Sequence, residues 1–296
     1  MLDEVFEIWV KDYAKEHNRR WAQDVSRYNL YIQPYLGSMK LSDITPDILI
    51  RWRSKILRQK KKRGDGFVTK GTVQRAVTVL SSIYSNSAKH VSNPCSELDH
   101  YKPQKRTQFF QSDHLNRFFT AINHPATPEY LRDYLLLSLY TGARKSNVLG
   151  MQWEHIDLNL KLWLIPDNET KNTEPMVVPL LDQAVELLKK RVLHKSSIYV
   201  FPTPRQSKTG HLVEPKKAWK SLLKRAELSE TYRLHDLRRT MGSWQAITGT
   251  STKIIGASLG QKSEAATAHY AHLTIEPVRA AMQRAADAMD DQKQKS

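Results

Sequence analysis

Five side chains stand in an order and at spacings that could serve one reaction. Arg144 follows a glycine-containing turn in "TGARKSNVLGMQW", and Lys171 lies in "TKNTEPMVVPL". His235 and Arg238 are three residues apart in "LHDLRRTMGSW", so they share one face of a helix. Tyr270 lies in "AHYAHL". Taken singly, each is more often a surface charge, a helix cap or a packed ring, so only the combination suggests chemistry.

Together with its flanking text, this order resembles the tyrosine recombinase, or phage integrase, family. The resemblance includes "TGARKSNVLGMQWEHID", "YVFPTP", "LHDLRRTMGSW" and the "LG" that precedes Gln261, nine residues before Tyr270. It covers residues 106–275 at the level of motifs. More loosely, the first part of the chain resembles the family's core-binding domain.

The resemblance implies phosphoryl transfer on a DNA backbone without a metal or any other cofactor. Arg144 and Arg238 would stabilise negative charge on the scissile phosphate, because a guanidinium is a charged fork of donors. Tyr270 would attack phosphorus and leave a 3′-phosphotyrosyl link with a free 5′-hydroxyl, which stores the bond energy without ATP. His235 is the expected base or charge stabiliser, and Lys171 the expected acid for the departing 5′-oxygen.

Gln261 departs from the histidine, or less often tryptophan, that the family has after "LG". An amide can donate a hydrogen bond but cannot carry charge or shuttle a proton. Losing one charge-assisted bond, worth on the order of 1–3 kcal/mol, would slow the site by about one or two decades. Asn147 replaces a common acidic residue and could orient the arginines by hydrogen bonding. His269 and His272 are interpreted as local packing or hydrogen-bonding groups.

The charge of the chain indicates a polyanionic partner. The net charge is +16 over 296 residues, and residues 1–105 and 106–296 each carry +8. Positive charge on both parts favours two surfaces that face duplex DNA. The basic stretch "RQKKKRGDGFVTK" and the helix after it supply the predicted DNA-binding residues Arg58, Lys60, Lys61, Lys62, Arg63, Lys70 and Arg75.

Other features bear on the compartment. Cys95 is the single cysteine, so an intrachain disulfide is excluded, and the acidic start "MLDEVFEIWV" is not a signal peptide. The apolar run "YLLLSLY" is too short to span a bilayer. We expect a prokaryotic, cytoplasmic protein associated with the nucleoid.

Hydrophobic periodicity predicts a mainly α-helical chain with a small β-sheet or hairpin. The first part reads as an all-helical bundle, in which Thr45 caps a helix that begins with Pro46. In the second part Ser112 is the predicted cap of another helix, and 160–166 and 174–180 are predicted strands of a hairpin. The predicted helices are 1–35, 46–57, 71–90, 113–122, 130–140, 182–193, 216–226, 234–247, 251–260 and a C-terminal helix from 279.

Together with the resemblance, these elements suggest four regions. They are a helical, SAM-like core-binding domain (1–95), a linker (96–110), an α+β DNA breaking-rejoining catalytic domain (111–285) and a polar tail (286–296). By the resemblance, the two domains would clamp specific double-stranded DNA sites. A homotetramer would exchange strands through a Holliday junction, with bending or directionality factors as further partners. The segment after Glu276 is expected to dock on a neighbouring copy.

Two alternatives remain open at the level of sequence. One is a DNA-binding protein of the same fold with weakened catalysis, for which Gln261 is the only argument. The other is a type IB-like topoisomerase, whose chemistry is the same. The wording "HDLRRT" and "YAHL" favours a recombinase, and "TGARKSNVLGMQWEHIDL" resembles integrases of mobile elements.

Overall fold

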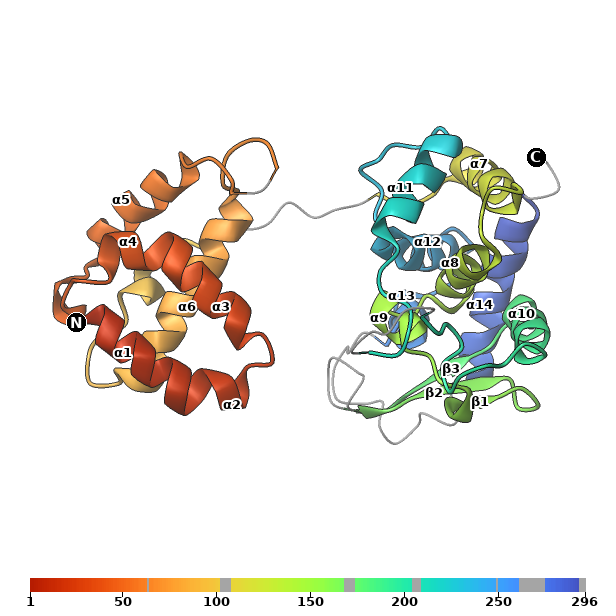
Figure 1. Ribbon diagram of the computed structural model, residues 1–296, viewed down its shortest axis with the longest axis horizontal. Coiled ribbons are helices and arrows are strands. Elements are labelled where there is room, and N and C mark those ends of the chain that lie inside the picture. Colours follow the sequence, from red (N-terminus) through yellow and green to blue (C-terminus); the bar gives the residue numbers. More distant parts are fainter. Residues whose placement is uncertain are drawn as a thin grey trace. The chain divides into compact units, whose positions relative to one another are not determined.

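A computed structural model describes residues 1–62, 64–101, 108–167, 174–203, 209–248, 250–260 and 275–292. The chain divides into two compact units, 1–106 and 107–296, each with its own hydrophobic core (Figure 1). The division falls inside the predicted linker. Residues at both ends of that interval nevertheless pack into cores: Leu98 belongs to the first core and Phe110 to the second.

The first unit is helical, as the periodicity predicts. Its helices are α1 (Leu2–Trp9), which continues through Val10–Ala14 into α2 (Lys15–His17), α3 (Trp21–Arg27), which continues through Tyr28–Ile32 into α4 (Gln33–Leu36), α5 (Pro46–Leu57) and α6 (Lys70–Ser87). Thr45 caps α5, where its Oγ1 accepts a hydrogen bond from the Ile48 amide. Helix α6 packs against α1, α3 and α5 and buries Leu80 and Ile83 completely.

The chain between α5 and α6 forms a short antiparallel turn that displays basic side chains. Lys60 pairs with Phe67, and the Val68 amide donates to the Gln59 carbonyl. Arg63 lies outside the described residues. The other six predicted DNA-binding residues are all exposed: Arg58, Lys60, Lys61, Lys62, Lys70 and Arg75.

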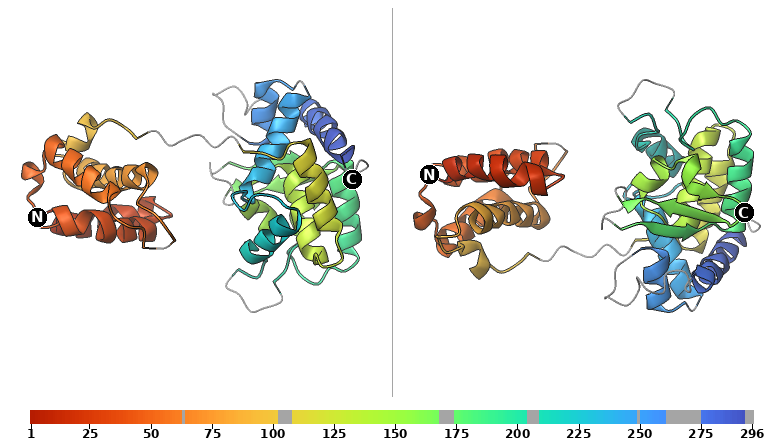
Figure 2. Two further views of the ribbon diagram at one scale, coloured as in Figure 1. Left: turned by 90° about the horizontal axis from the view of Figure 1, so that it is seen from above. Right: turned by 90° about the horizontal axis from the view of Figure 1, so that it is seen from below.

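The second unit is α+β. Its helices are α7 (Ser112–Asn123), α8 (Glu129–Thr141), α9 (Lys145–Leu149), α10 (Asp182–Val192), α11 (Lys216–Arg225), α12 (His235–Ile247), α13 (Thr252–Ser258) and α14 (Ile275–Asp290). The predicted hairpin is β2 (Leu162–Ile165) and β3 (Met176–Pro179), with Trp163 opposite Val178. A short strand that was not predicted, β1 (Ile156–Asp157), pairs with β2. The three strands lie on one face of this unit (Figure 2).

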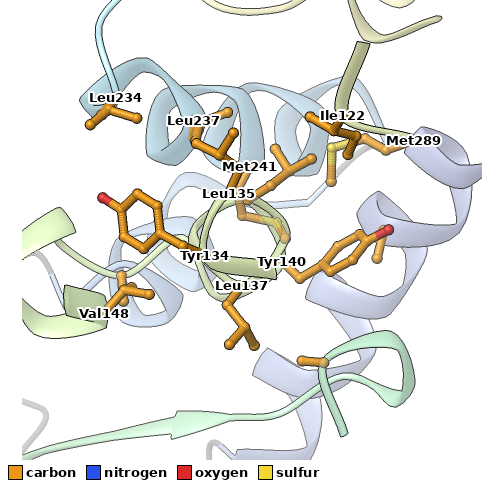
Figure 3. Close-up of a cluster of buried hydrophobic side chains, with 14 of the residues drawn as sticks. Ile122, Tyr134, Leu135, Leu137, Tyr140, Val148, Leu234, Leu237, Met241 and Met289 are labelled. Carbon is orange, nitrogen blue, oxygen red and sulfur yellow. The ribbon is translucent and has the colours of Figure 1, made fainter. Parts of the chain in front are cut away.

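Helix α8 is the centre of the second core. It packs against α9, α10 and α12, and its nearly continuous apolar sequence allows it to be enclosed. Leu135 and Leu137 are fully buried, and Figure 3 shows Leu135 beside Met241 of α12 and Leu137 on the opposite side of α8. This core fixes the C-terminal end of α8 and the N-terminal end of α12, where two of the predicted site residues lie.

Two predictions need correction here. Ser112 is the first residue of α7 rather than its cap, because Gln111 occupies the cap position. The polar tail predicted from residue 286 begins too early, because Ala286 and Met289 are fully buried in the core of their own unit. The Tyr140 hydroxyl donates to Asp290 Oδ1 at 2.6 Å. Burial of α14 therefore needs no neighbouring copy.

Candidate active site

Arg238 is the most constrained residue of the predicted site. Its side chain rises from the first turn of α12 and is only 6% exposed. One terminal nitrogen donates to the Gly142 carbonyl at 2.8 Å, and the other donates to the Leu259 carbonyl. The guanidinium thus joins the end of α8 to the end of α13. A guanidinium has five N–H donors, so donors remain for a ligand after these two bonds.

Electrostatics place Arg144 near Arg238. Burial, and after it the positive charge of Arg144, lower the pKa of Arg238 to about 10. Two guanidinium groups within electrostatic reach, with one nearly buried, repel each other unless an anion lies between them. The pair is therefore suited to bind a phosphate.

The backbone at the end of α8 determines the position of Arg144. Gly142 has φ +57°, a left-handed conformation that ends the helix and that glycine adopts without cost. Arg144 then caps α9, and its carbonyl accepts from the amides of Asn147 and Val148. Its side chain is partly exposed, and among the described residues the guanidinium has no hydrogen bond or ion pair. The predicted neighbour Asn147 is buried beside it in the chain.

His235 begins α12 and lies at the surface. Desolvation of its ring, followed by the positive charges of Arg238 and Arg239, lowers the pKa of His235. The imidazole is therefore neutral at pH 7 and has one nitrogen free to accept a proton. His235 and Arg238 share one face of α12, as their spacing predicts.

Asp236 is a positioning residue that sequence reasoning missed. Its carboxylate is fully buried and accepts from the Arg233 amide at 2.8 Å and from Arg239. These bonds fix the start of α12 and turn Arg239 toward Asp236. The signal in the sequence was an acidic residue in the first turn of a helix, which is favourable there but common.

Lys171, Gln261 and Tyr270 lie outside the described residues. Gly260 is the last described residue before Gln261. The described residues resume at Glu174, two residues before Met176, after the range that contains Lys171. Gly260 and Met176 touch, because a Cβ at Gly260 would lie 2.4 Å from the sulfur of Met176. The Met176 side chain therefore lies beside the end of α13, next to Leu259, whose carbonyl accepts from Arg238.

Two features are absent from the part of the chain that the structure describes. Within those ranges, no three His, Cys, Asp or Glu side chains gather as metal ligands do. None of the described helices combines the length and apolar character that crossing a membrane requires.

Comparison with known proteins agrees with this arrangement. Residues 108–276 match the phage integrase family, and residues 1–57 match the phage integrase N-terminal SAM-like domain. The integrase of Salmonella phage P22 is 24% identical over 90% of this chain and 74% of its own length. Tyrosine recombinase XerC 2 of Ralstonia nicotianae is 27% identical over 92% of this chain and 81% of its own.

Solved structures show the same fold. A lambda integrase (75–356) dimer bound to a COC′ core site has a TM-score of 0.69 at 17% identity, covering 90% of this chain and 98% of that one. The Tn1549 transposon integrase in complex with transposon right-end DNA has a TM-score of 0.66 at 13% identity, covering 93% and 99%. The chain belongs to the phage integrase family of tyrosine recombinases.

Proposed function

We propose that this protein is a site-specific DNA recombinase that cleaves and rejoins DNA through a 3′-phosphotyrosyl intermediate. One observation carries the proposal. Arg144 lies within electrostatic reach of Arg238, which shares one face of α12 with His235 and donates to the carbonyls of Gly142 and Leu259. Four separate parts of the sequence would thus supply an anion-binding pair, a neutral imidazole, an amine and a phenol to the proposed site.

The proposed reaction follows from these groups. The guanidinium groups of Arg144 and Arg238 bind the non-bridging oxygens of the scissile phosphate and stabilise the charge that develops on them. The phenol oxygen of Tyr270 attacks phosphorus, and its proton passes to His235. The bond from phosphorus to the 5′-oxygen breaks, and Lys171 protonates that oxygen. Reversal with a different 5′-hydroxyl rejoins the strand, so the phosphodiester count is unchanged.

The remaining parts of the proposal concern DNA and assembly. The exposed basic residues of the turn between α5 and α6 would contact the DNA backbone, which would make affinity fall steeply with salt. Because each protomer carries one nucleophile, exchange between two duplexes needs four copies on specific sites. We place the protein at the nucleoid of a prokaryotic cell.

The test is capture of covalent adducts. The full chain is incubated with sheared DNA from its source genome, and adducts that survive SDS are isolated and their joined ends sequenced. Adducts that converge on one short sequence and vanish in Tyr270→Phe would support a recombinase. Scattered adducts that depend on Tyr270 would indicate a topoisomerase-like enzyme instead.

Gln261→His, assayed in parallel, tests the residue that departs from the family. We expect this variant to form adducts about tenfold to a hundredfold faster than the wild type, because a charged donor replaces a neutral one. Adducts from Gln261→His but none from the wild type would instead favour a DNA-binding protein that lacks catalysis.

A further inference from the structure

A buried arginine in the first unit lacks a counter-charge. Arg53 of α5 is 5% exposed, and its Nε is sealed from solvent with no hydrogen-bond partner. No ion pair or hydrogen bond joins its terminal nitrogens to any described residue. The undescribed positions of this unit, 63 and 102–106, contain no acidic residue. The terminal nitrogens are not sealed from solvent, so their N–H donors can reach an anion from outside the protein.

The surroundings of Arg53 are built from the linker and from α6. The guanidinium carbon lies 3.7 Å from the centroid of the Tyr101 ring, and the Lys70 ammonium lies 5.6 Å from the same centroid. Tyr101 is held there because its amide donates to Gln74 Oε1 of α6 at 2.9 Å. Two cations that form no ion pair with any described residue therefore lie against one aromatic ring.

The first turn of α6 adds backbone donors at this place. Thr69 caps the helix and satisfies the Thr72 amide, whereas the amides of Lys70 and Gly71 have no described acceptor. A Cβ at Gly71 would meet nothing closer than the Thr69 hydroxyl at 4.0 Å, so the space above these amides is open. The positive end of an 18-residue helix favours an anion there.

We propose that Arg53, Lys70 and the first turn of α6 form a binding site for one phosphodiester of duplex DNA. The guanidinium supplies the donors, the Tyr101 ring covers one of its faces, and the helix amides and Lys70 complete the oxygen contacts. Tyr101 lies at the start of the chain that leads to the second unit. This inference rests on the proposed function, since it assumes DNA as the partner.

The test uses the full chain with Tyr270→Phe as the background, so that binding is measured without cleavage. Its affinity for a 30-base-pair duplex labelled with fluorescein is measured by anisotropy across a salt series. In Arg53→Met we expect affinity to fall about tenfold and the slope of log K against log salt to become shallower by about one. Lys70→Met, at an exposed position, should lower the slope by a similar amount.

Thermal unfolding of the DNA-free protein separates a binding role from a structural one. Methionine keeps the contact with Tyr101 and removes an unpaired charge, so the midpoint of Arg53→Met should stay level or rise. Arg51→Met removes the same charge from an exposed position of the same helix and should change the slope by less than half as much. An unchanged slope in Arg53→Met or Lys70→Met, or an equal loss in Arg51→Met, would overturn the inference.

The experiments distinguish a failure of the recombinase proposal from a failure of the proposed phosphate site. If wild type forms Tyr270-dependent adducts but Arg53→Met keeps the wild-type slope, the recombinase stands and the phosphate site does not. If the slope falls in Arg53→Met while wild type forms no adducts, the phosphate site stands and the catalytic proposal does not.

Discussion

Gly142→Ala should disable the site without touching a catalytic side chain. The left-handed φ of +57° at this position suits glycine. An added Cβ would lie 2.8 Å from Leu259 Cδ2 and 3.1 Å from Met241 Cγ. Leu259 is pushed away first, and its carbonyl is one of the two acceptors that hold Arg238. The Gly142 carbonyl is the other acceptor, so one methyl group disturbs both.

The expected cost has two parts. Alanine in the left-handed region costs roughly 1–2 kcal/mol. Crowding a packed core by one methyl group costs typically 1–3 kcal/mol. The sum, about 2–5 kcal/mol, is a large fraction of the stability of an ordinary domain. If relaxation moves Leu259 instead of unfolding the unit, Arg238 loses an anchor. We then expect the rate of adduct formation to fall by about two decades, as for removal of one preorganised donor.

Gly64→Ala is a matched control for the backbone cost. Gly64 has φ +77°, and a Cβ there meets nothing within 4 Å. This variant should therefore show the strain alone, roughly 1–2 kcal/mol, and it serves as a control for stability only because Gly64 lies in the basic turn. Stability is compared by urea denaturation followed with a probe for each unit, because the two units can unfold separately. Rates are compared at saturating protein with the DNA site identified from the adduct pool.

Two results would contradict this reasoning. If Gly142→Ala and Gly64→Ala lose equal stability, Leu259 does not resist the added methyl group. If Gly142→Ala forms adducts at the wild-type rate, the two carbonyl bonds do not position Arg238 for its work.

Two further predictions concern the protonation state of His235 and the hydrogen bond that joins Tyr140 to Asp290 of α14. The adduct rate should fall as pH decreases through a pKa of His235 that lies below the ordinary value, because only the neutral ring accepts a proton. In His235→Gln the rate of adduct formation should be lower, and its fall at low pH should disappear from the pH–rate profile. If the same fall remains in this variant, another group titrates there. Tyr140→Phe should lower the stability of the second unit by about 1–2 kcal/mol, because Asp290 loses its hydroxyl donor. Chemical denaturation measures this loss, with the exposed Tyr130→Phe as control, and equal stability of the two variants would rule out the bond as a tether of α14.

The sequence was informative wherever a pattern repeats or a motif carries chemistry. Periodicity gave the helices and the hairpin, and the resemblance gave Arg144, His235 and Arg238, which the structure brings together. The sequence could not predict the hydrogen-bond acceptors of Arg238. They are the backbone carbonyls of Gly142 and Leu259, and every residue type has such a carbonyl. The burial of the C-terminal half of α14 was also not predicted. Alanine and methionine among charged residues give a weak apolar stripe, yet small side chains let the helix pack closely.

Substitution of the two arginines should affect the stability of the free protein differently. Arg238 bridges two carbonyls, so Arg238→Met leaves two buried acceptors unpaired, at about 1–3 kcal/mol each, partly offset by removing a buried charge. Arg144 has no described partner, and its charge opposes that of Arg238. Arg144→Met should therefore leave the free protein as stable as wild type or more so, although both variants lose adduct formation. Urea denaturation of the two variants decides the matter. Equal destabilisation would mean that Arg144 also holds the fold, and its role could then not be reduced to binding the phosphate.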